Sequence, residues 1–280
     1  MSRALESSRR PRPAGSERPP AARRPRVPDP VLTVAVVAVV LAAAEAVARS
    51  GAVSRLILPA PSEVFAALVG GIRDGSFLDA TWDTVWPTVV GFVLSSVVAI
   101  ATGGLLGSLP RLESVLMPLV YAIQATPKVA IAPLVILWFG FDAPGKIVVV
   151  GIVTFFPVVV NTLAGMRIRE REKAELMRAM GATKMQVFRY IRLPNALPYI
   201  FAGLHVGIIF SLIGAVVAEF VGSRAGLGYL LVQQKALFDV AGVFASIVLL
   251  MVIGIVFNRI MVIAERRIVF WAEDTTGTPI

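Results

Sequence analysis

Residues Gly165 to Pro194, GMRIREREKAELMRAMGATKMQVFRYIRLP, form a charged block between two long apolar stretches. Basic residues outnumber acidic ones in this block, and Gly181 divides it into two short segments with helical patterns. The neighbouring stretches are too apolar for a water-exposed surface, whereas the block is too polar for the interior of a bilayer. We therefore expect the chain to cross a membrane before and after the block, which itself lies in water.

The composition of the chain is that of an integral membrane protein. Of its 280 residues, 56% are hydrophobic and 16% are charged, whereas soluble domains carry roughly 25% charged residues. The net charge of +9 does not indicate nucleic-acid binding, because the basic residues flank apolar runs and orient them in a bilayer. The sequence has no cysteine and a single histidine, so we expect no enzyme activity, no metal site and no cofactor.

The ends of the chain differ from its apolar middle. Residues 1–30 are rich in Arg, Pro, Ser and Ala, and they cannot bury enough apolar surface to offset their ordering entropy. We expect a disordered basic tail there and a short polar tail over residues 265–280. The membrane domain is then residues 31–264.

Six apolar stretches are candidates for membrane-spanning helices, each of which needs about 20 residues to cross the hydrocarbon core. They lie at residues 31–47, 84–109, 112–139, 147–164, 197–220 and 242–264. A short helix over 63–72, capped by Ser62, is expected at the membrane surface after the first span. The predicted fold is an all-α, polytopic membrane bundle of six transmembrane helices.

Two of these spans carry small residues at every fourth position. The positions are Gly91, Ser95, Ala99, Gly103 and Gly107 in the second span, and Gly203, Gly207, Ser211 and Ala215 in the fifth. Small side chains let two helix backbones approach closely in lipid, where packing drives association. We expect both faces to be buried against other helices, with generic glycine-rich membrane helices as the alternative.

Polar residues inside the spans are the candidates for a translocation path. Gln124 and Lys128 lie at the centre of the third span, which three prolines interrupt. Backbone groups freed by proline are tolerated at membrane depth only against protein or water, and a charge there is costly. Asn161 in the fourth span and Glu219 near the end of the fifth complete the set. Snorkelling of Lys128 and a structural salt bridge of Glu219 are the alternatives.

The segment from Gly140 to Lys146 has the spacing GxxxxGK of a phosphate-binding loop. That loop requires Ser or Thr after the lysine and a strand before the first glycine. Here Ile147 follows the lysine, and apolar membrane spans lie on both sides. We interpret the segment as a short connection on the outer side of the membrane.

The distribution of basic residues predicts the orientation of the chain. Six spans place both termini on one side of the membrane. The basic N-terminal tail, the block at 165–194 and the pair Arg266–Arg267 then all lie on that side, whereas the opposite connections have mixed charge. By the positive-inside rule, both termini are cytoplasmic.

The charged block resembles the EAA loop of the permeases of binding-protein-dependent ABC importers. The family pattern is Glu-Ala-Ala, three residues, Gly, nine residues and Ile-x-Leu-Pro. The residues that match it in register are Glu175, Gly181, Ile191, Leu193 and Pro194. Leu176 and Met177 replace the two alanines. The resemblance implies a cytoplasmic coupling loop, residues 165–195, that docks on an ATP-binding subunit.

Shorter motifs resemble the nitrate, sulfonate and taurine branch of this family. They are Leu58–Ser62, the stretch from Pro127 to Gly140, Phe155–Pro157 with Asn161 and Thr162, and Glu219 with Gly226–Tyr229. The resemblance implies the type I importer permease fold in the plasma membrane and a homodimer. It also implies two ATP-binding subunits inside and a substrate-binding protein outside. The solute would be a small organic or inorganic anion, with a pyrimidine precursor or another organic solute as alternatives.

The block also has physical properties that suit docking. Met177 belongs to a face of flexible apolar side chains that can fill a partner's groove, while Glu175 and Arg178 share a second face. Gly181 permits a reversal of chain direction, and Leu193–Pro194 is expected to end the second short helix before the fifth span. A solvated cytoplasmic loop is the alternative.

These observations predict the permease subunit of an ATP-driven importer that works by alternating access. A secondary transporter or channel, the main rival, would need inverted repeats or a charged path through several helices. An intramembrane enzyme would need a nucleophile or metal constellation at bilayer depth. Neither pattern is visible in the sequence.

Overall fold

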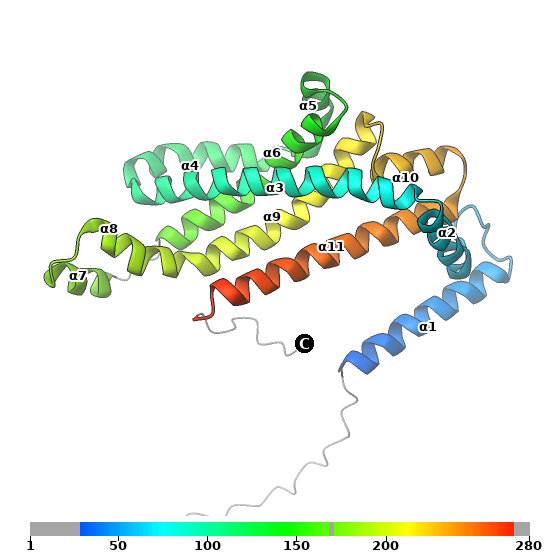
Figure 1. Cartoon of the computed structure of the whole chain (residues 1–280), viewed down its shortest axis with the longest axis horizontal. Helices are drawn as coiled ribbons and strands as arrows, with labels where there is room; N and C mark the ends of the chain where they lie inside the picture. The colour runs from blue at the N-terminus through cyan, green and yellow to red at the C-terminus, as the bar shows by residue number, and fades with distance from the viewer. Residues whose placement is uncertain (1–28, 168–170, 272–280) are drawn as a thin grey trace, which may run out of the picture. The chain divides into compact units, whose positions relative to one another are not determined.

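The computed structural model describes residues 29–167 and 171–271 (Figure 1). All regular elements within these residues are helices, as predicted. The predicted N-terminal tail therefore lies almost entirely outside the described residues, as do Glu170 of the charged block and most of the C-terminal tail. The chain separates into two units, residues 1–42 and residues 43–279, and all contacts discussed below lie within the second unit.

Most of the predicted spans are single long helices. Those long and apolar enough to cross a membrane are α1 (Asp29–Arg49), α3 (Ser76–Ser108), α6 (Ala143–Arg167), α9 (Leu193–Gly222) and α11 (Val240–Ile268). The third predicted span is broken into α4 (Pro110–Ala125), the 3-10 turn η1 (Lys128–Ile131) and α5 (Ala132–Phe139). Its two parts meet at 78°, and counting them as one span gives six within the described residues.

Shorter helices connect or cover these spans. They are α2 (Pro61–Arg73), α7 (Arg171–Ala179), α8 (Lys184–Val187), the π-helical turn η2 (Phe188–Arg192) and α10 (Leu227–Ala236). The charged block therefore contains α7, α8 and η2, which lie together at one end of the long helices (Figure 1).

Ser62 does not cap α2, contrary to the sequence-based prediction. The helix begins at Pro61, whose fixed φ suits the first helical position. The carboxylate of Glu63 accepts the N–H of Ala60 at 3.2 Å. Ser62 lies inside the first turn and donates its N–H and its hydroxyl to the Glu45 carboxylate, at 3.0 and 2.8 Å. Its side chain therefore links α2 to the end of the preceding span.

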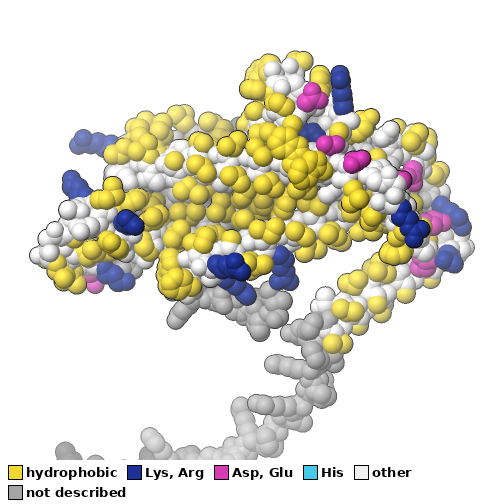
Figure 2. All heavy atoms as spheres, in the orientation of Figure 1, with side chains coloured by type: hydrophobic (Ala, Val, Ile, Leu, Met, Phe, Trp, Pro, Cys, Tyr) yellow, Lys and Arg dark blue, Asp and Glu magenta, His cyan; other side chains and the backbone are white. Residues whose placement is uncertain are grey.

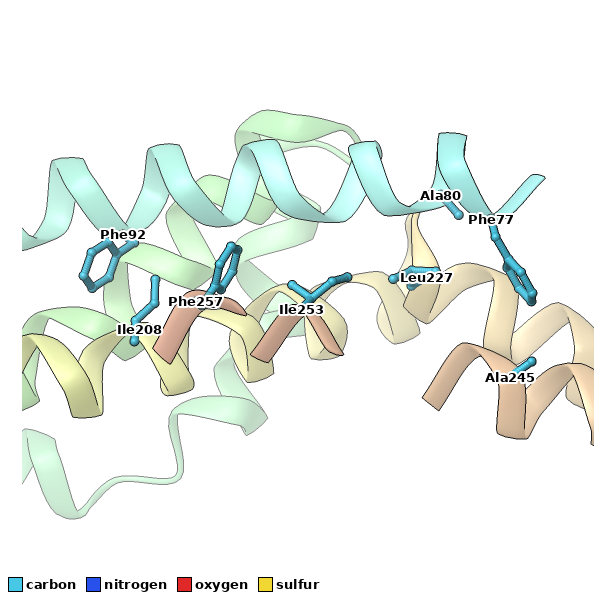
Figure 3. Packing of buried hydrophobic residues seen from close by; sticks show 8 residues of the cluster. All are labelled: Phe77, Ala80, Phe92, Ile208, Leu227, Ala245, Ile253 and Phe257. Carbon is cyan, nitrogen blue, oxygen red and sulfur yellow. The ribbon is translucent and has the colours of Figure 1, made fainter. Parts of the chain in front are cut away.

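The second span starts earlier than predicted, because a buried cluster holds the first turns of α3 (Figure 3). Phe77 and Ala80 of α3 pack in this cluster with Leu227 of α10 and Ala245 of α11. Asp79 and Asp83, which precede the predicted span of residues 84–109, consequently belong to α3. The same cluster continues along the bundle to Phe92.

The centre of the second unit is formed by α3, α6 and α9, with α6 packed against both of the others (Figure 1). A Cβ atom placed on Gly91 of α3 would lie 2.7 Å from Val150 Cγ1 of α6. A Cβ atom on Gly203 of α9 would lie 2.8 Å from Asn161 Cβ of the same helix α6. The small-residue faces of the second and fifth spans therefore lie against α6, as expected.

Two neighbouring glycines of α3 allow a test of this packing. A Cβ atom on Gly103 would lie 2.8 Å from Thr162 Cβ, whereas one on Gly104 would meet no heavy atom within 4 Å. Overpacking a helix contact costs about 1–3 kcal/mol. We expect Gly103→Leu to lower the thermal unfolding midpoint of the purified protein clearly, and Gly104→Leu to leave it nearly unchanged. Equal effects of the two substitutions would contradict the close approach of α3 and α6.

Candidate functional site

The α7–α8 segment, residues 171–187, is built around a tight reversal at Gly181. Gly181 has a φ of +86°, in the left-handed region that favours glycine. Its N–H donates to the carbonyl of Arg178 (2.9 Å), and the N–H of Ala182 donates to that of Met177 (2.9 Å). This pair of bonds is the Schellman motif, which satisfies the last carbonyls of α7. The predicted reversal at Gly181 is thus observed, together with the hydrogen bonds that stabilise it.

The second half of the turn is also closed by hydrogen bonds. Thr183 precedes α8, and its hydroxyl accepts the N–H of Gln186 at 3.3 Å. In return, the Gln186 side chain accepts the N–H of Thr183 at 2.7 Å. This reciprocal capping box satisfies donors at the helix start that would otherwise be unpaired. The turn between α7 and α8 therefore has a defined shape before any partner binds.

Large apolar side chains are exposed around this turn. The exposed fractions are 79% for Met180 and 70% for Met185, and Leu176 and Tyr190 are exposed as well. Met177, Met180 and Tyr190 contribute to the lining of a cavity of about 260 Å³ that also borders Gly181. Exposed apolar surface rimmed by polar groups is typical of an interaction site. Flexible methionine side chains suit such a surface, because they adapt to a partner's shape.

The remaining residues of the predicted coupling loop lie on both sides of this cavity. Glu175 and Arg178 are exposed on α7. Ile191, Leu193 and Pro194 are half-buried in η2 and at the start of α9. The structure therefore brings Met177 and Gly181 together at the cavity, while the Ile-x-Leu-Pro part joins the segment to the membrane helix.

The predicted end of the helix at Leu193–Pro194 is wrong. The chain is helical from Lys184 to Gly222. Between α8 and α9 the helix widens into the π turn η2, in which the N–H of Leu193 donates to the carbonyl of Phe188. The proline ring of Pro194 would clash with a carbonyl inside a regular α-helix, and the wider turn before it relieves this constraint. The α7–α8 segment is therefore continuous with α9.

A second polar site is buried at the other end of the long helices. The Lys146 ammonium on α6 lies 2.9 Å from Oε1 of Glu219 on α9, with both side chains almost fully buried. It also donates to the carbonyl oxygens of Asp83 (3.2 Å) and Ala225 (2.7 Å). The Thr84 hydroxyl of α3 donates to Glu219 Oε1 at 2.9 Å. We call Lys146, Glu219 and Thr84 the Lys146–Glu219 cluster.

The Lys146–Glu219 cluster also caps the N-terminus of α10. Oε2 of Glu219 accepts the N–H of Gly228 (2.7 Å), and the Thr84 hydroxyl accepts that of Leu227 (2.8 Å). These are the first two N–H groups of α10, which have no partner inside the helix and attract negative charge. Gly226, with a φ of +113°, leaves room for the carboxylate, since any Cβ atom there would collide with it. The cluster therefore joins α3, α6, α9 and α10.

The sequence pointed to only part of this arrangement. A structural salt bridge was one of the two readings of Glu219, but its partner Lys146 was assigned to a simple connection. One sequence feature could have indicated the pair. Lys146 lies at the start of the fourth predicted span and Glu219 near the end of the fifth, so that the two lie at a similar depth in the membrane. An ion this deep in a membrane domain needs a partner.

The candidates in the third span lie at the break between α4 and η1. The Lys128 ammonium donates to the backbone carbonyl of Gln124 at 3.0 Å. It also lies 5.1 Å from the centre of the Phe156 ring of α6. Asn161, further along α6, donates to the carbonyl of Pro157 at 2.8 Å. The structure therefore brings Gln124 and Lys128 together, whereas Glu219 belongs to the Lys146–Glu219 cluster.

The single histidine links two of the long helices. Nε2 of His205 on α9 lies 2.8 Å from the Glu265 carboxylate on α11, and Nδ1 lies 3.4 Å from Oδ1 of Asn258. His205 is thus hydrogen bonded in the packing between α9 and α11. Glu265, which the sequence assigned to the C-terminal tail, belongs to α11.

Charged side chains are unevenly distributed over the second unit. In Figure 2 most of the face shown is hydrophobic, and Lys and Arg side chains occur around α7, α8 and the end of α11. Most Asp and Glu side chains lie toward the other end, near α2 and α10. An apolar belt between a basic end and a mixed end is the pattern of a polytopic membrane protein.

The described residues form a bundle of candidate membrane spans with exposed apolar side chains on a short helical segment at one end, and this defines a polytopic membrane protein. Residues 91–270, more than half of the chain, match the family described as binding-protein-dependent transport system inner membrane component. The chain belongs to this family. It is therefore a permease subunit of an ABC importer in the inner membrane, as the resemblance implied. The family is one of transport proteins and not of enzymes.

Several curated relatives are similar over most of their length. The riboflavin transport system permease protein RibX of Chloroflexus aurantiacus is 34% identical over 77% of this chain and 80% of its own length. The formylaminopyrimidine transport permease protein ThiX of Halalkalibacterium halodurans is 35% identical over 71% of this chain and 79% of its own. The putative aliphatic sulfonates transport permease protein SsuC of Bacillus subtilis is 30% identical over 86% of this chain and 87% of its own length.

A solved structure has the same fold. It is an inward-facing form of the MetNI methionine ABC transporter, with a TM-score of 0.59 and 20% sequence identity. The match covers 71% of this chain and 96% of that chain. The type I permease fold expected from the resemblance is therefore confirmed.

Proposed function

We propose that the chain forms the translocation path of an importer for a small solute and is driven through its α7–α8 segment by an ATP-binding subunit. The family establishes an importer that depends on a binding protein. The observation that carries the docking proposal is the exposed apolar surface around Gly181. This surface is preformed by the Schellman turn and lies at the end of a helix continuous with α9.

The continuity of α8, η2 and α9 supports a simple route for the movement. Closure of an ATP-binding dimer would displace the α7–α8 segment. Because the helix runs without interruption to Gly222, the displacement reaches the membrane-spanning part of α9 directly. There, α9 packs closely on α6 through small residues such as Gly203, so the two helices would move together. Such rigid-body tilting is a common form of alternating access.

The assembly proposed from the family resemblance has two copies of this chain, two ATP-binding subunits and one extracytoplasmic binding protein. Both termini are proposed to be cytoplasmic, with tails before α1 and after α11. The basic side chains around α7 and α8 support this orientation, because cytoplasmic loops are enriched in Lys and Arg. The coupling residues are proposed to be Glu175, Met177, Arg178, Gly181, Ile191, Leu193 and Pro194.

For the solute, we propose a small anion of the sulfonate, taurine or nitrate type. The relative named for aliphatic sulfonates supports an anion, whereas those named for riboflavin and formylaminopyrimidine support other organic solutes. Gln124, Lys128 and Asn161 are proposed to line the path. Glu219, also a path candidate, is buried and hydrogen bonded to Thr84, Lys146 and Gly228, and we propose that it acts by holding the cluster together.

Docking can be tested by copurification of this chain with its ATP-binding subunit. Met180→Glu places a charge on the proposed contact, and loss of a central interface residue lowers affinity by about fivefold or more. We therefore expect the amount of ATP-binding subunit recovered with Met180→Glu to fall by about fivefold or more. Leu237→Glu is the matched control, because Leu237 is an equally prominent exposed apolar residue, 72% exposed, that follows α10 at the other end. Equal recovery with both variants would show that the α7–α8 segment is not the docking site.

A further inference from the structure

The break in the third span leaves a cation at membrane depth. Thr126 and Pro127 are extended between α4 and η1, and Lys128 is the first residue of η1. The two parts of the span are otherwise apolar enough to cross a membrane together. Irregular backbone at this depth is found where it lines a water-filled cavity or lies against protein. Broken helices of this kind form the binding sites of several transporter folds.

The surroundings of the Lys128 ammonium are neutral. Its partners are the carbonyl of Gln124 in the last turn of α4 (3.0 Å) and the ring of Phe156 (5.1 Å to the centroid). Both stabilise a positive charge, the first through the negative end of the helix dipole and the second through the ring quadrupole. The ion pairs among the described residues do not include Lys128. Within the described residues, the contacts of the ammonium are therefore a carbonyl and an aromatic ring, with no carboxylate among them.

The same phenylalanine borders an apolar groove between α3 and α6. The groove has a volume of about 450 Å³, and Leu94, Val98, Ile152 and Phe156 are among its lining residues. This volume is in the range of sites for small molecules, roughly 300–1,000 Å³. Phe156 therefore contacts the Lys128 ammonium and also lines the apolar groove. Such a site suits a ligand with one anionic group and an apolar body.

We propose that Lys128 and the α3–α6 groove form a transient site for an organic anion with an apolar body, such as an alkyl sulfonate or carboxylate. The anionic group would pair with Lys128 while the apolar part lies along Phe156 and Ile152. This membrane chain thereby favours anions by itself, in addition to any selection by the binding protein. The inference rests on the proposed translocation function, and it adds that the translocation path prefers anions to cations.

The absence of native cysteines allows a direct measurement of the local potential. Ile152→Cys places a thiol in the groove one helical turn from Phe156. Only a water-exposed thiolate reacts with methanethiosulfonates, of which one reagent carries a sulfonate and another a trimethylammonium group. We expect the sulfonate reagent to be favoured in the purified full-length chain. Lys128→Gln should lower the ratio of the two rates about tenfold, and Lys128→Arg should preserve it.

Protection and control experiments complete the test. Butanesulfonate should slow the labelling of Ile152→Cys when Lys128 is present, and inorganic sulfate, which lacks an apolar body, should do so less. At Met180→Cys, outside the groove, Lys128→Gln should leave the ratio unchanged. An unchanged ratio at Ile152→Cys, or a thiol that neither soluble reagent reaches, would overturn the proposal. Neither outcome depends on docking of the ATP-binding subunit, so failure of the proposed function is detected separately by copurification.

Discussion

Lys146→Met should destabilise the protein far more than the double substitution Lys146→Met with Glu219→Gln. The single change leaves the carboxylate of Glu219 buried without its cation, and such a loss typically costs about 3–5 kcal/mol. Replacing both charges removes this penalty. A glutamine at 219 can still accept the N–H of Gly228, so the start of α10 keeps a partner. We therefore expect the double variant to recover most of the lost stability.

The measurement is the unfolding midpoint of the purified chain, followed by tryptophan fluorescence at fixed detergent concentration. Arg49→Met is the matched control, because Arg49 pairs with Glu45 at 2.5 Å but is 68% exposed. An exposed pair contributes at most about 1 kcal/mol. If Lys146→Met behaved like Arg49→Met, or if the double variant were as unstable as the single one, the buried ion pair of the Lys146–Glu219 cluster would not stabilise the fold as argued.

Gly181→Val should uncouple ATP hydrolysis from uptake while the protein still inserts in the membrane. A Cβ atom at Gly181 meets no heavy atom within 4 Å, so the effect is not steric crowding by neighbours. It arises from the φ of +86°, which costs an L-residue roughly 1–2 kcal/mol and a β-branched residue more. The turn would relax, and the methionine side chains would lose their arrangement. We expect uptake to fall about tenfold or more.

Gly181→Asn separates this backbone effect from the loss of glycine itself. Asparagine adopts the left-handed conformation more readily than other L-residues, so it should retain most of the coupling. Uptake and binding-protein-stimulated ATP hydrolysis are measured in proteoliposomes that contain the complete transporter. Normal values for Gly181→Val, or an equal loss with Gly181→Asn, would exclude the left-handed turn as the basis of coupling.

The helical content and the positions of the spans could be predicted from the sequence, because apolar runs of this length have few other structures available. The break in the third span was also foreseeable from its three prolines. The exact start of α3 was not, since aspartates at 79 and 83 suggested a connection while tertiary packing of Phe77 and Ala80 extends the helix. Propensity at a helix end is easily overridden by such packing.

The α7–α8 segment was predictable because a local pattern defines it. The Gly181 turn and the exposed methionines depend only on residues close together in the sequence. The Lys146–Glu219 cluster was not predictable in full, since its members come from α3, α6 and α9 and they cap the start of α10. The spacing around Lys146 resembles a phosphate-binding loop, and this local pattern gives no indication that Lys146 pairs with the carboxylate of Glu219, which lies far away in the sequence.

The π turn between Phe188 and Arg192 has a geometric consequence of its own. It closes its hydrogen bonds over one more residue than a regular turn, and a helix rotates by about 100° for each residue. The direction in which the methionines face, relative to α9, is therefore determined by this single additional residue. Deleting one residue between positions 188 and 192 would rotate the whole α7–α8 segment to another side of the protein, with its own turn and caps unchanged.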